Sequence, residues 1–201
     1  MPRPYPLRTA LVAALCAVLA SCGGSSRGPD YAGAPSNQND LCAIFDQRPG
    51  WREAVEASAS KWGAPVAVQM AIMWRESSFR ADVRPPTKYT LGVIPAGPVS
   101  SAYGYAQAID GTWDWYRDAT GQDDADRTVF EDAADFVGWY MSRSNAANGI
   151  DMWDAYNQYL AYHEGHAGHR RGSYNAKDWL LGVADRVADQ AVLYNAQYRG
   201  C

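Results

Sequence analysis

The chain has 201 residues, of which 47% are hydrophobic and 20% charged, a balance that allows one packed domain of ordinary size or two very small ones and excludes global disorder. A formal net charge of −4 argues against a nucleic-acid-binding protein, because such a protein needs a basic face. Eight Trp and 13 Tyr against four Phe favour rings with a polar edge, which occur in carbohydrate-facing clefts and in small helical cores.

Residues 1–21 are typical of an export signal. A basic start is followed by an apolar run over residues 9–20, which is too short to span a membrane. The sequence Leu19-Ala20-Ser21-Cys22 resembles the lipobox of bacterial lipoproteins, so we expect Cys22 to be lipidated and to become the mature N-terminus. The alternative is an ordinary cleaved signal in which the cysteine occurs by chance. Removal of the signal leaves 16 basic against 22 acidic residues, a net charge of −6.

Residues 22–40 are rich in Gly, Ser, Pro and Asn and contain almost nothing apolar, which predicts a flexible tether. Beyond it only Cys42 and Cys201 remain, and an exported protein enters an oxidising compartment in which we expect them to form a disulfide. Such a bond would join the first residues of the folded part to the last residue of the chain. Two unpaired thiols are the alternative.

From Leu41 onward the apolar residues recur at helical spacing, which predicts one mostly α domain over residues 41–201. Gly63 followed by Pro65 indicates the end of one helix and the start of the next. Residues 65–75 are apolar almost all round, which is typical of a buried central helix. Three later stripes predict further helices around residues 130–141, 150–161 and 180–198.

Residues 81–105 interrupt this helical pattern with Pro, Gly and β-branched residues. The composition predicts one long loop or a small β-hairpin, and an excursion of this length is often functional.

The strongest local signal is Arg75-Glu76-Ser77-Ser78-Phe79, at the end of the most hydrophobic predicted helix. A carboxyl held against an apolar wall loses the hydration of its charged form, so we expect the pKa of Glu76 to be raised. A carboxyl that stays protonated near neutral pH can act as the general acid that glycoside cleavage requires. The alternative is a surface glutamate that pairs with Arg75 or Arg80 or caps the next segment.

Three motifs occur in order along the chain. They are Glu76-Ser77-Ser78-Phe79, then Ala102-Tyr103-Gly104-Tyr105-Ala106-Gln107 followed by Thr112-Trp113, and then Ala161-Tyr162-His163-Glu164-Gly165. They resemble the Glu-Ser-x-Phe, Gly-Leu-Met-Gln and Ala-Tyr-Asn-x-Gly motifs of the lytic transglycosylases with the soluble-lytic-transglycosylase domain, in the goose-type lysozyme-like superfamily. The resemblance covers most of residues 41–201 and implies a lysozyme-like helical fold, with the excursion beside the cleft as a lid or an extra wall.

The resemblance also implies a reaction that needs no cofactor. Glu76 would protonate the glycosidic oxygen between N-acetylmuramic acid and N-acetylglucosamine in peptidoglycan, and would then take the proton of the muramoyl C6 hydroxyl. That hydroxyl closes on C1 and gives a 1,6-anhydromuramoyl end without consuming water. A single glutamate, helped by the substrate's acetamido group, replaces the usual pair of carboxylates. Neither Asp82 nor Asp110 is therefore required as a second acid.

Supporting roles follow from the same resemblance. Ser77 would contact the sugar, Gln107 would line the cleft and bind the saccharide, and Tyr162 would orient Glu76. Gly104 would let the backbone come close at its turn. The alternatives are a helix cap for Ser77 and a buried aromatic ring for Tyr162.

His163 stands where the family has Asn, and because a neutral His both donates and accepts we expect it to keep a substrate contact and to add pH sensitivity. All three histidines lie between His163 and His169, with Glu164 among them. Their spacing differs from the His-Glu-x-x-His motif and two glycines disfavour a regular helical face, so we expect a solvated loop and no metal site.

Taken together, the sequence predicts an exported, lipid-anchored lytic transglycosylase that binds peptidoglycan glycan strands through stacking and hydrogen bonds. Gly23 after the anchor cysteine gives no Asp-type retention signal, which favours the periplasmic face of the outer membrane if the cell is Gram-negative. One alternative is a muramidase of the same fold, in which water captures the intermediate. The other is a peptidoglycan-binding lipoprotein without catalytic activity.

Overall fold

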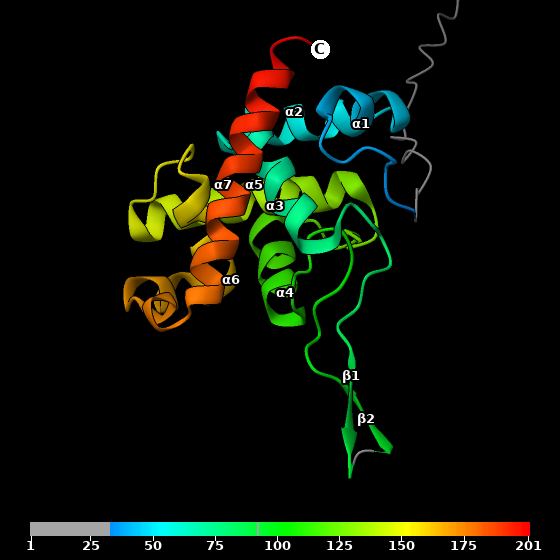
Figure 1. Ribbon diagram of the computed structural model, residues 1–201, viewed down its shortest axis with the longest axis vertical. Helices are drawn as coiled ribbons and strands as arrows, with labels where there is room; N and C mark the ends of the chain where they lie inside the picture. Colours follow the sequence, from blue (N-terminus) through cyan, green and yellow to red (C-terminus); the bar gives the residue numbers. More distant parts are fainter. Residues whose placement is uncertain (1–32, 92) are drawn as a thin grey trace, which may run out of the picture.

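The computed structural model describes residues 33–91 and 93–201. The predicted signal, residues 1–21, and the predicted lipidation site, Cys22, lie outside these residues. Within the described residues the chain forms seven α-helices, one short 3-10 helix and one two-stranded antiparallel hairpin (Figure 1). This architecture confirms the mostly α fold class with a small hairpin and is consistent with a lysozyme-like helical fold. None of the helices in this part of the chain is long and apolar enough to cross a membrane.

The elements follow the chain in a simple order. They are α1 (Leu41–Gln47), α2 (Trp51–Trp62), α3 (Val66–Ser77), β1 (Thr87–Thr90), β2 (Ile94–Pro98), α4 (Asp110–Thr120), α5 (Phe130–Asn148), α6 (Ala155–Arg170), η1 (Ser173–Ala176) and α7 (Asp178–Tyr198). The stripes predicted at 130–141 and 180–198 lie in α5 and α7. The stripe at 150–161 falls only partly in α6, because the Asp154 carboxylate caps the first turn by accepting a hydrogen bond from the backbone nitrogen of Asn157.

α3 is the central helix of the domain (Figure 1). All of its residues from Val66 to Met73 are buried, and the helix packs against α2, α5 and α7. The one polar side chain in this stretch, Gln69, donates its amide nitrogen to the backbone oxygens of Val55 and Ala64. Gly63 ends α2 in the left-handed region, with a φ of 72°, before α3 begins. The prediction of a buried central helix over residues 65–75 is therefore confirmed.

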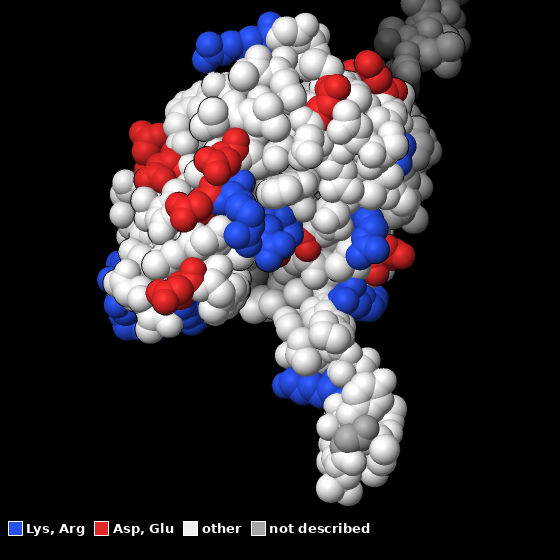
Figure 2. Space-filling model, viewed as in Figure 1, with Lys and Arg blue, Asp and Glu red and all other residues white. Residues whose placement is uncertain are grey.

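The predicted excursion forms a hairpin that projects away from the helical body (Figure 1). β1 and β2 pair antiparallel, with Thr87 opposite Pro98 and Thr90 opposite Ile94, and all the strand residues except Gly97 are exposed. Figure 2 shows the hairpin as largely uncharged surface, while charges of both signs are scattered over the visible face of the helical body. The strands themselves lie away from the helices, whereas the segments on both sides of the hairpin pack on them, through Phe79 and Ala81 before β1 and Ala106 and Ala108 after β2.

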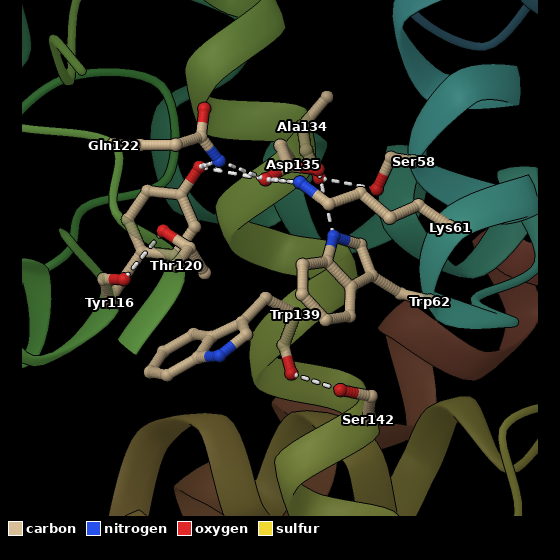
Figure 3. A network of polar contacts seen from close by, with 10 residues as sticks. All are labelled: Ser58, Lys61, Trp62, Tyr116, Thr120, Gln122, Ala134, Asp135, Trp139 and Ser142. Carbon is tan, nitrogen blue, oxygen red and sulfur yellow. Dashed lines mark hydrogen bonds and ion pairs between the residues drawn. The ribbon is translucent and has the colours of Figure 1, made fainter. Parts of the chain in front are cut away.

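A polar network around Asp135 joins α2, α4 and α5 (Figure 3). The Asp135 carboxylate accepts hydrogen bonds from Trp62 Nε1 at 2.8 Å and from Lys61 Nζ at 3.0 Å, both on α2. It also accepts from the Tyr116 hydroxyl at 2.8 Å and from Gln122 Nε2 at 2.6 Å, on and just beyond α4. One partly buried carboxylate therefore fixes the positions of three helices relative to one another.

The two ends of the described chain are tied together. Cys42 and Cys201 form a disulfide across 159 residues, as predicted. Beside it, Gln197 accepts a hydrogen bond from the backbone nitrogen of Leu41 at 2.9 Å and donates one to the backbone oxygen of Asn39, also at 2.9 Å. The bond and its neighbours hold α1 against the end of α7.

The polar segment before α1 also contacts the helices. Ser36 donates from both its backbone nitrogen and its hydroxyl to Gln47 Oε1, each at 2.9 Å, and Pro35 is buried. The domain boundary at residue 41 stays a prediction, but the last part of the predicted tether, residues 33–40, lies against the domain.

Replacing both Cys42 and Cys201 by Ser is expected to lower the free energy of unfolding by about 2–5 kcal/mol, because the loop that the disulfide closes is long. Urea denaturation without reductant measures the change. Reductant should shift the wild-type midpoint toward that of the double variant and leave the variant's own midpoint unmoved. An unchanged midpoint in the variant would show that the bond does not stabilise the domain.

Candidate active site

A cleft of about 430 Å³ lies where the end of α3, the segment after the hairpin, α4, α5 and α6 meet. Four of the residues singled out from the sequence line it: Glu76, Gln107, Tyr162 and His163. The other lining residues are Ser100, Ala102, Ala108, Ile109, Thr112, Phe136, Tyr140, Glu164 and Gly165. The three sequence motifs, far apart along the chain, therefore meet at one cavity whose wall combines aromatic rings with hydrogen-bonding groups.

Glu76 lies in the last turn of α3. The helix ends because Ser78 adopts a left-handed conformation, with a φ of 52°, and Phe79 after it is fully buried. Burial raises the pKa of Glu76 to about 7, although a hydrogen-bonding interaction with Tyr159 and the charge of Arg75 act in the opposite direction. The direction is the one that the sequence predicts. At neutral pH this carboxyl is therefore present in both forms, so it can give a proton and then take one back.

Tyr159 and Tyr162 of α6 both interact with Glu76. A hydrogen-bonding interaction with Tyr159 lowers the pKa of Glu76, while burial and the Glu76 charge raise the pKa of the Tyr162 phenol. Tyr159 is buried one turn before Tyr162 on α6, and the nearby Glu76 charge adds to the burial that raises the pKa of its phenol. The Tyr162 hydroxyl instead donates to the backbone oxygen of Ala106 at 2.6 Å. Tyr159 belongs to none of the three sequence motifs, although its spacing of three residues from Tyr162 places both on one helix face.

The turn that carries Gln107 depends on a glycine. Gly104 has a φ of 76°, and a Cβ at this position would lie 2.0 Å from the backbone oxygen of Arg127. The same oxygen accepts a hydrogen bond from the backbone nitrogen of Tyr105 at 3.1 Å. Gln107 Nε2 donates to the backbone oxygens of Val83 and Gly104, at 2.9 and 2.8 Å. The amide nitrogen of Gln107 thus holds the turn, and its carbonyl oxygen is the atom left for a ligand among the described residues.

Arg127 holds the same segment from outside the cleft. Its guanidinium donates to the backbone oxygen of Ala108 at 2.9 Å and forms an ion pair with Asp110 at 2.8 Å. Asp82 is exposed, and neither Asp82 nor Asp110 lines the cleft. Sequence reasoning did not single out Arg127, because only the fold brings it to the second motif.

The Ser77 hydroxyl does not point into the cleft, where a sugar contact was predicted. The residue is buried, and its hydroxyl donates to the backbone oxygen of Met73 at 3.2 Å, one turn earlier on α3. It faces its own helix and is absent from the residues that line the cleft.

The segment 163–169 is helical, and the predicted solvated loop is wrong. α6 continues to Arg170 with one interruption at Gly165, whose φ of 72° and ψ of 159° are not helical. The helix resumes because His166 stacks on Tyr140, with ring centroids 4.6 Å apart, and its Nε2 lies 3.1 Å from Ser144 Oγ. Among the described residues no three His, Cys, Asp or Glu side chains come close enough together to share a metal ion.

Glu164 is a second carboxylate in the cleft wall, and it is ionised. Its oxygens accept hydrogen bonds from Lys177 Nζ at 2.6 Å, from the Ser173 hydroxyl and from His163 Nδ1 at 2.9 Å. Burial acts to raise the pKa of Glu164, but these three hydrogen bonds outweigh it and lower the pKa to about 2. The two glutamates of the cleft therefore differ in protonation at neutral pH.

A profile of the family described as the transglycosylase SLT domain matches residues 10–201. The chain belongs to this family. A search of curated proteins finds no match. The SLT domain supports a function of the lytic transglycosylase type that acts on peptidoglycan, and it implies that the domain binds peptidoglycan as its substrate. The family resemblance drawn from the three motifs is thereby confirmed.

Replacing Gly104 of the SLT domain by Ala is expected to lower the free energy of unfolding by at least about 2 kcal/mol, since the new Cβ meets a backbone oxygen and the φ is left-handed. Thermal denaturation measures the loss. Gly111→Ala is the matched control, because this helical glycine has no atom within 4 Å of an added Cβ. Equal stability of the two variants would contradict the close approach at Gly104.

Replacing Glu76 by Gln is expected to stabilise the SLT domain above neutral pH. In the native state Glu76 keeps its proton up to about pH 7, whereas in the unfolded state it has the ordinary pKa of 4.5 and loses its proton earlier. The free energy of unfolding of the wild type therefore falls as the pH rises between these two values. The loss relative to Glu76→Gln is about 3 kcal/mol at pH 8.

Urea denaturation at pH 5 and pH 8 measures the difference between the two proteins. Glu53→Gln, at an exposed position on α2, is the control and should follow the wild type. Parallel pH profiles of stability for wild type and Glu76→Gln would show that burial does not raise the pKa of this carboxyl.

Proposed function

We propose that the protein is a lytic transglycosylase that cleaves the β-1,4 bond between N-acetylmuramic acid and N-acetylglucosamine in peptidoglycan and leaves 1,6-anhydromuramoyl ends. The observation that carries this proposal is the Glu76 carboxyl, which lines the cleft of an SLT domain and has its pKa raised by burial to about 7. The reaction needs one group that is first an acid and then a base, and this pKa suits both roles near neutral pH.

In the first step, the protonated Glu76 carboxyl donates its proton to the glycosidic oxygen. The bond between this oxygen and C1 of the muramoyl ring breaks, and its electron pair stays with the departing N-acetylglucosamine hydroxyl. The substrate's acetamido oxygen stabilises the positive charge at C1, so that no second protein carboxylate is needed. Glu76 is left ionised, a form that the interaction with Tyr159 favours.

In the second step, the Glu76 carboxylate takes the proton of the muramoyl C6 hydroxyl. The C6 oxygen attacks C1, which closes the anhydro ring and returns Glu76 to its protonated form. No water is consumed, and no cofactor takes part. Tyr162 supports the reaction from the cleft wall, because its hydrogen bond to Ala106 holds the turn that presents Gln107 to the saccharide.

Mature wild-type protein incubated with purified sacculi is expected to release fragments whose muramoyl ends are one water lighter than reducing ends, as measured by mass spectrometry. Glu76→Gln should lose at least about 100-fold in rate, because it can neither give nor take the proton. Glu53→Gln, exposed on α2, should match the wild type.

Other outcomes would point to the alternatives. Reducing ends alone would identify a muramidase, in which water takes the place of the C6 hydroxyl. Binding to sacculi without any cleavage would identify a wall-binding lipoprotein. Full activity of Glu76→Gln would overturn the mechanism whatever the products are.

We also propose that residues 1–21 are removed and that Cys22 is lipidated, which anchors the domain at the cell envelope, on the periplasmic face of the outer membrane in a Gram-negative cell. The supporting observation is the sequence of residues 19–22, with its small residues before the cysteine.

Cell fractionation of a Cys22→Ala variant tests the anchor, since the variant should lose its membrane retention. Cys16→Ala, inside the segment that is removed, should stay with the membrane fraction. Unchanged retention of Cys22→Ala would refute lipidation at this site.

A further inference from the structure

Trp179 is an exposed indole at the border of the cleft. It lies in the first turn of α7, and 59% of its surface is accessible. Its ring meets the ring of His163 edge to face, with centroids 5.3 Å apart and an angle of 76° between the planes. Because His163 lines the cleft, Trp179 continues the cleft wall beyond its edge and presents an aromatic surface to solvent.

Glu164 links the two elements that carry these rings. This side chain is only 5% exposed, and it accepts hydrogen bonds from His163 on α6 and from Lys177, which directly precedes α7. Ser173, in the 3-10 helix between them, donates a third hydrogen bond. A carboxylate that is nearly buried is costly to desolvate, and its hydrogen bonds, including the one from Lys177, which is 38% exposed, favour one arrangement of the elements they join. Here it joins the kink in α6 to the start of α7.

The same contacts decide which nitrogen of His163 can meet a ligand. Its Nδ1 is engaged with Glu164 Oε1, so Nε2 is the ring nitrogen left for a hydroxyl or acetamido group. An exposed indole beside one hydrogen-bonding ring suits a pyranose, whose apolar face stacks on an aromatic surface while its edge carries hydroxyl groups. Lys177, two residues before Trp179, offers no free charge to an anionic ligand, because it is paired with Glu164.

We propose that His163 and Trp179 form a second sugar-binding subsite, which holds an N-acetylhexosamine ring of the glycan strand beyond the pair of rings at Glu76, and that Glu164 is its positioning residue. The proposal rests on the proposed function, in that the strand reaches this subsite by running along the cleft. It also predicts that the affinity depends on the length of the glycan strand, since only a strand longer than the cleft gains the stacking contact.

The test uses the hexamer of N-acetylglucosamine, which carries no peptide stem, and measures its dissociation constant with the mature protein by calorimetry. Trp179→Ala is expected to weaken binding about tenfold, and Trp179→Phe to restore most of the loss because a ring remains. Trp153→Ala is the matched control. Trp153 is 62% exposed and precedes α6, and it is absent from the residues that line the cleft, so its loss should leave the affinity unchanged.

A double-mutant cycle tests the positioning role. Glu164→Gln should weaken hexamer binding, and in the Trp179→Ala background it should weaken binding much less, because the ring that it positions is gone. Fully additive losses of binding would show that Glu164 acts independently of Trp179, which would refute its positioning role. Thermal denaturation of each variant identifies any that fail to fold.

The binding assay separates this proposal from the proposed function, because it does not need cleavage. Equal hexamer affinity of wild type and Trp179→Ala, or no hexamer binding at all, would refute the subsite and leave the reaction at Glu76 untouched. Trp179-dependent binding without cleavage of sacculi would support the subsite and refute the reaction. Trp179-dependent binding of stem-bearing fragments but not of the hexamer would show that the occupant is peptide, which also refutes the proposal.

Discussion

The enclosure of α3 by α2, α5 and α7 is the constraint on which the site depends. Over Val66–Met73 the helix has no exposed side, so only its last turn emerges, and it emerges at the cleft. The Glu76 carboxyl in that turn is desolvated by the same packing that stabilises the core. Its pKa near 7 is therefore a consequence of where the helix ends, and the left-handed Ser78 sets that point. Above neutral pH the ionised carboxyl lowers the stability of the domain. The same raised pKa lets the carboxyl exchange its proton near neutral pH.

The walls around Glu76 are held by contacts that lie mostly outside the cleft. The Asp135 network fixes α4 and α5 against α2 (Figure 3), and Gly138 on α5 allows the approach, because a Cβ there would lie 2.2 Å from Ser58 Oγ. On the opposite side, Arg127 and Tyr162 hold the turn of Gln107 from two directions. The groups that line the cleft are thus kept in place by backbone carbonyls and one carboxylate outside it, and substitutions there should affect the site through its geometry.

Local pattern and covalent chemistry explain what could be predicted from the sequence. An apolar run between Pro65 and a charged end indicates α3, two cysteines in a chain with a predicted export signal indicate the disulfide, and clustered Pro and Gly indicate the hairpin. The positions of Tyr159 and Arg127 could not be found in this way, because each meets its partner only through packing between distant elements. The continuation of α6 past Gly165 could not be predicted for the same reason, because the contact between His166 and Tyr140 of α5 stabilises it. Ser77 shows the converse limit: a motif places the residue next to Glu76, but helix geometry turns its hydroxyl toward Met73.

The disulfide at the entrance to the domain also has a mechanical consequence. Cys42 lies at the second residue of the first helix, and the chain between it and Cys201 is a closed covalent loop. If the N-terminal segment is anchored while the cleft holds the cell wall, a pulling force enters the domain at Cys42 and divides there between two chain paths, one through α1 and α2 and the other backward through α7. Each path carries part of the load, and Arg52 of α2, which donates to the backbone oxygen of Cys201 at 2.8 Å, links the two where they diverge. Tension applied in this way therefore cannot peel the domain apart one helix at a time from Cys42 onward.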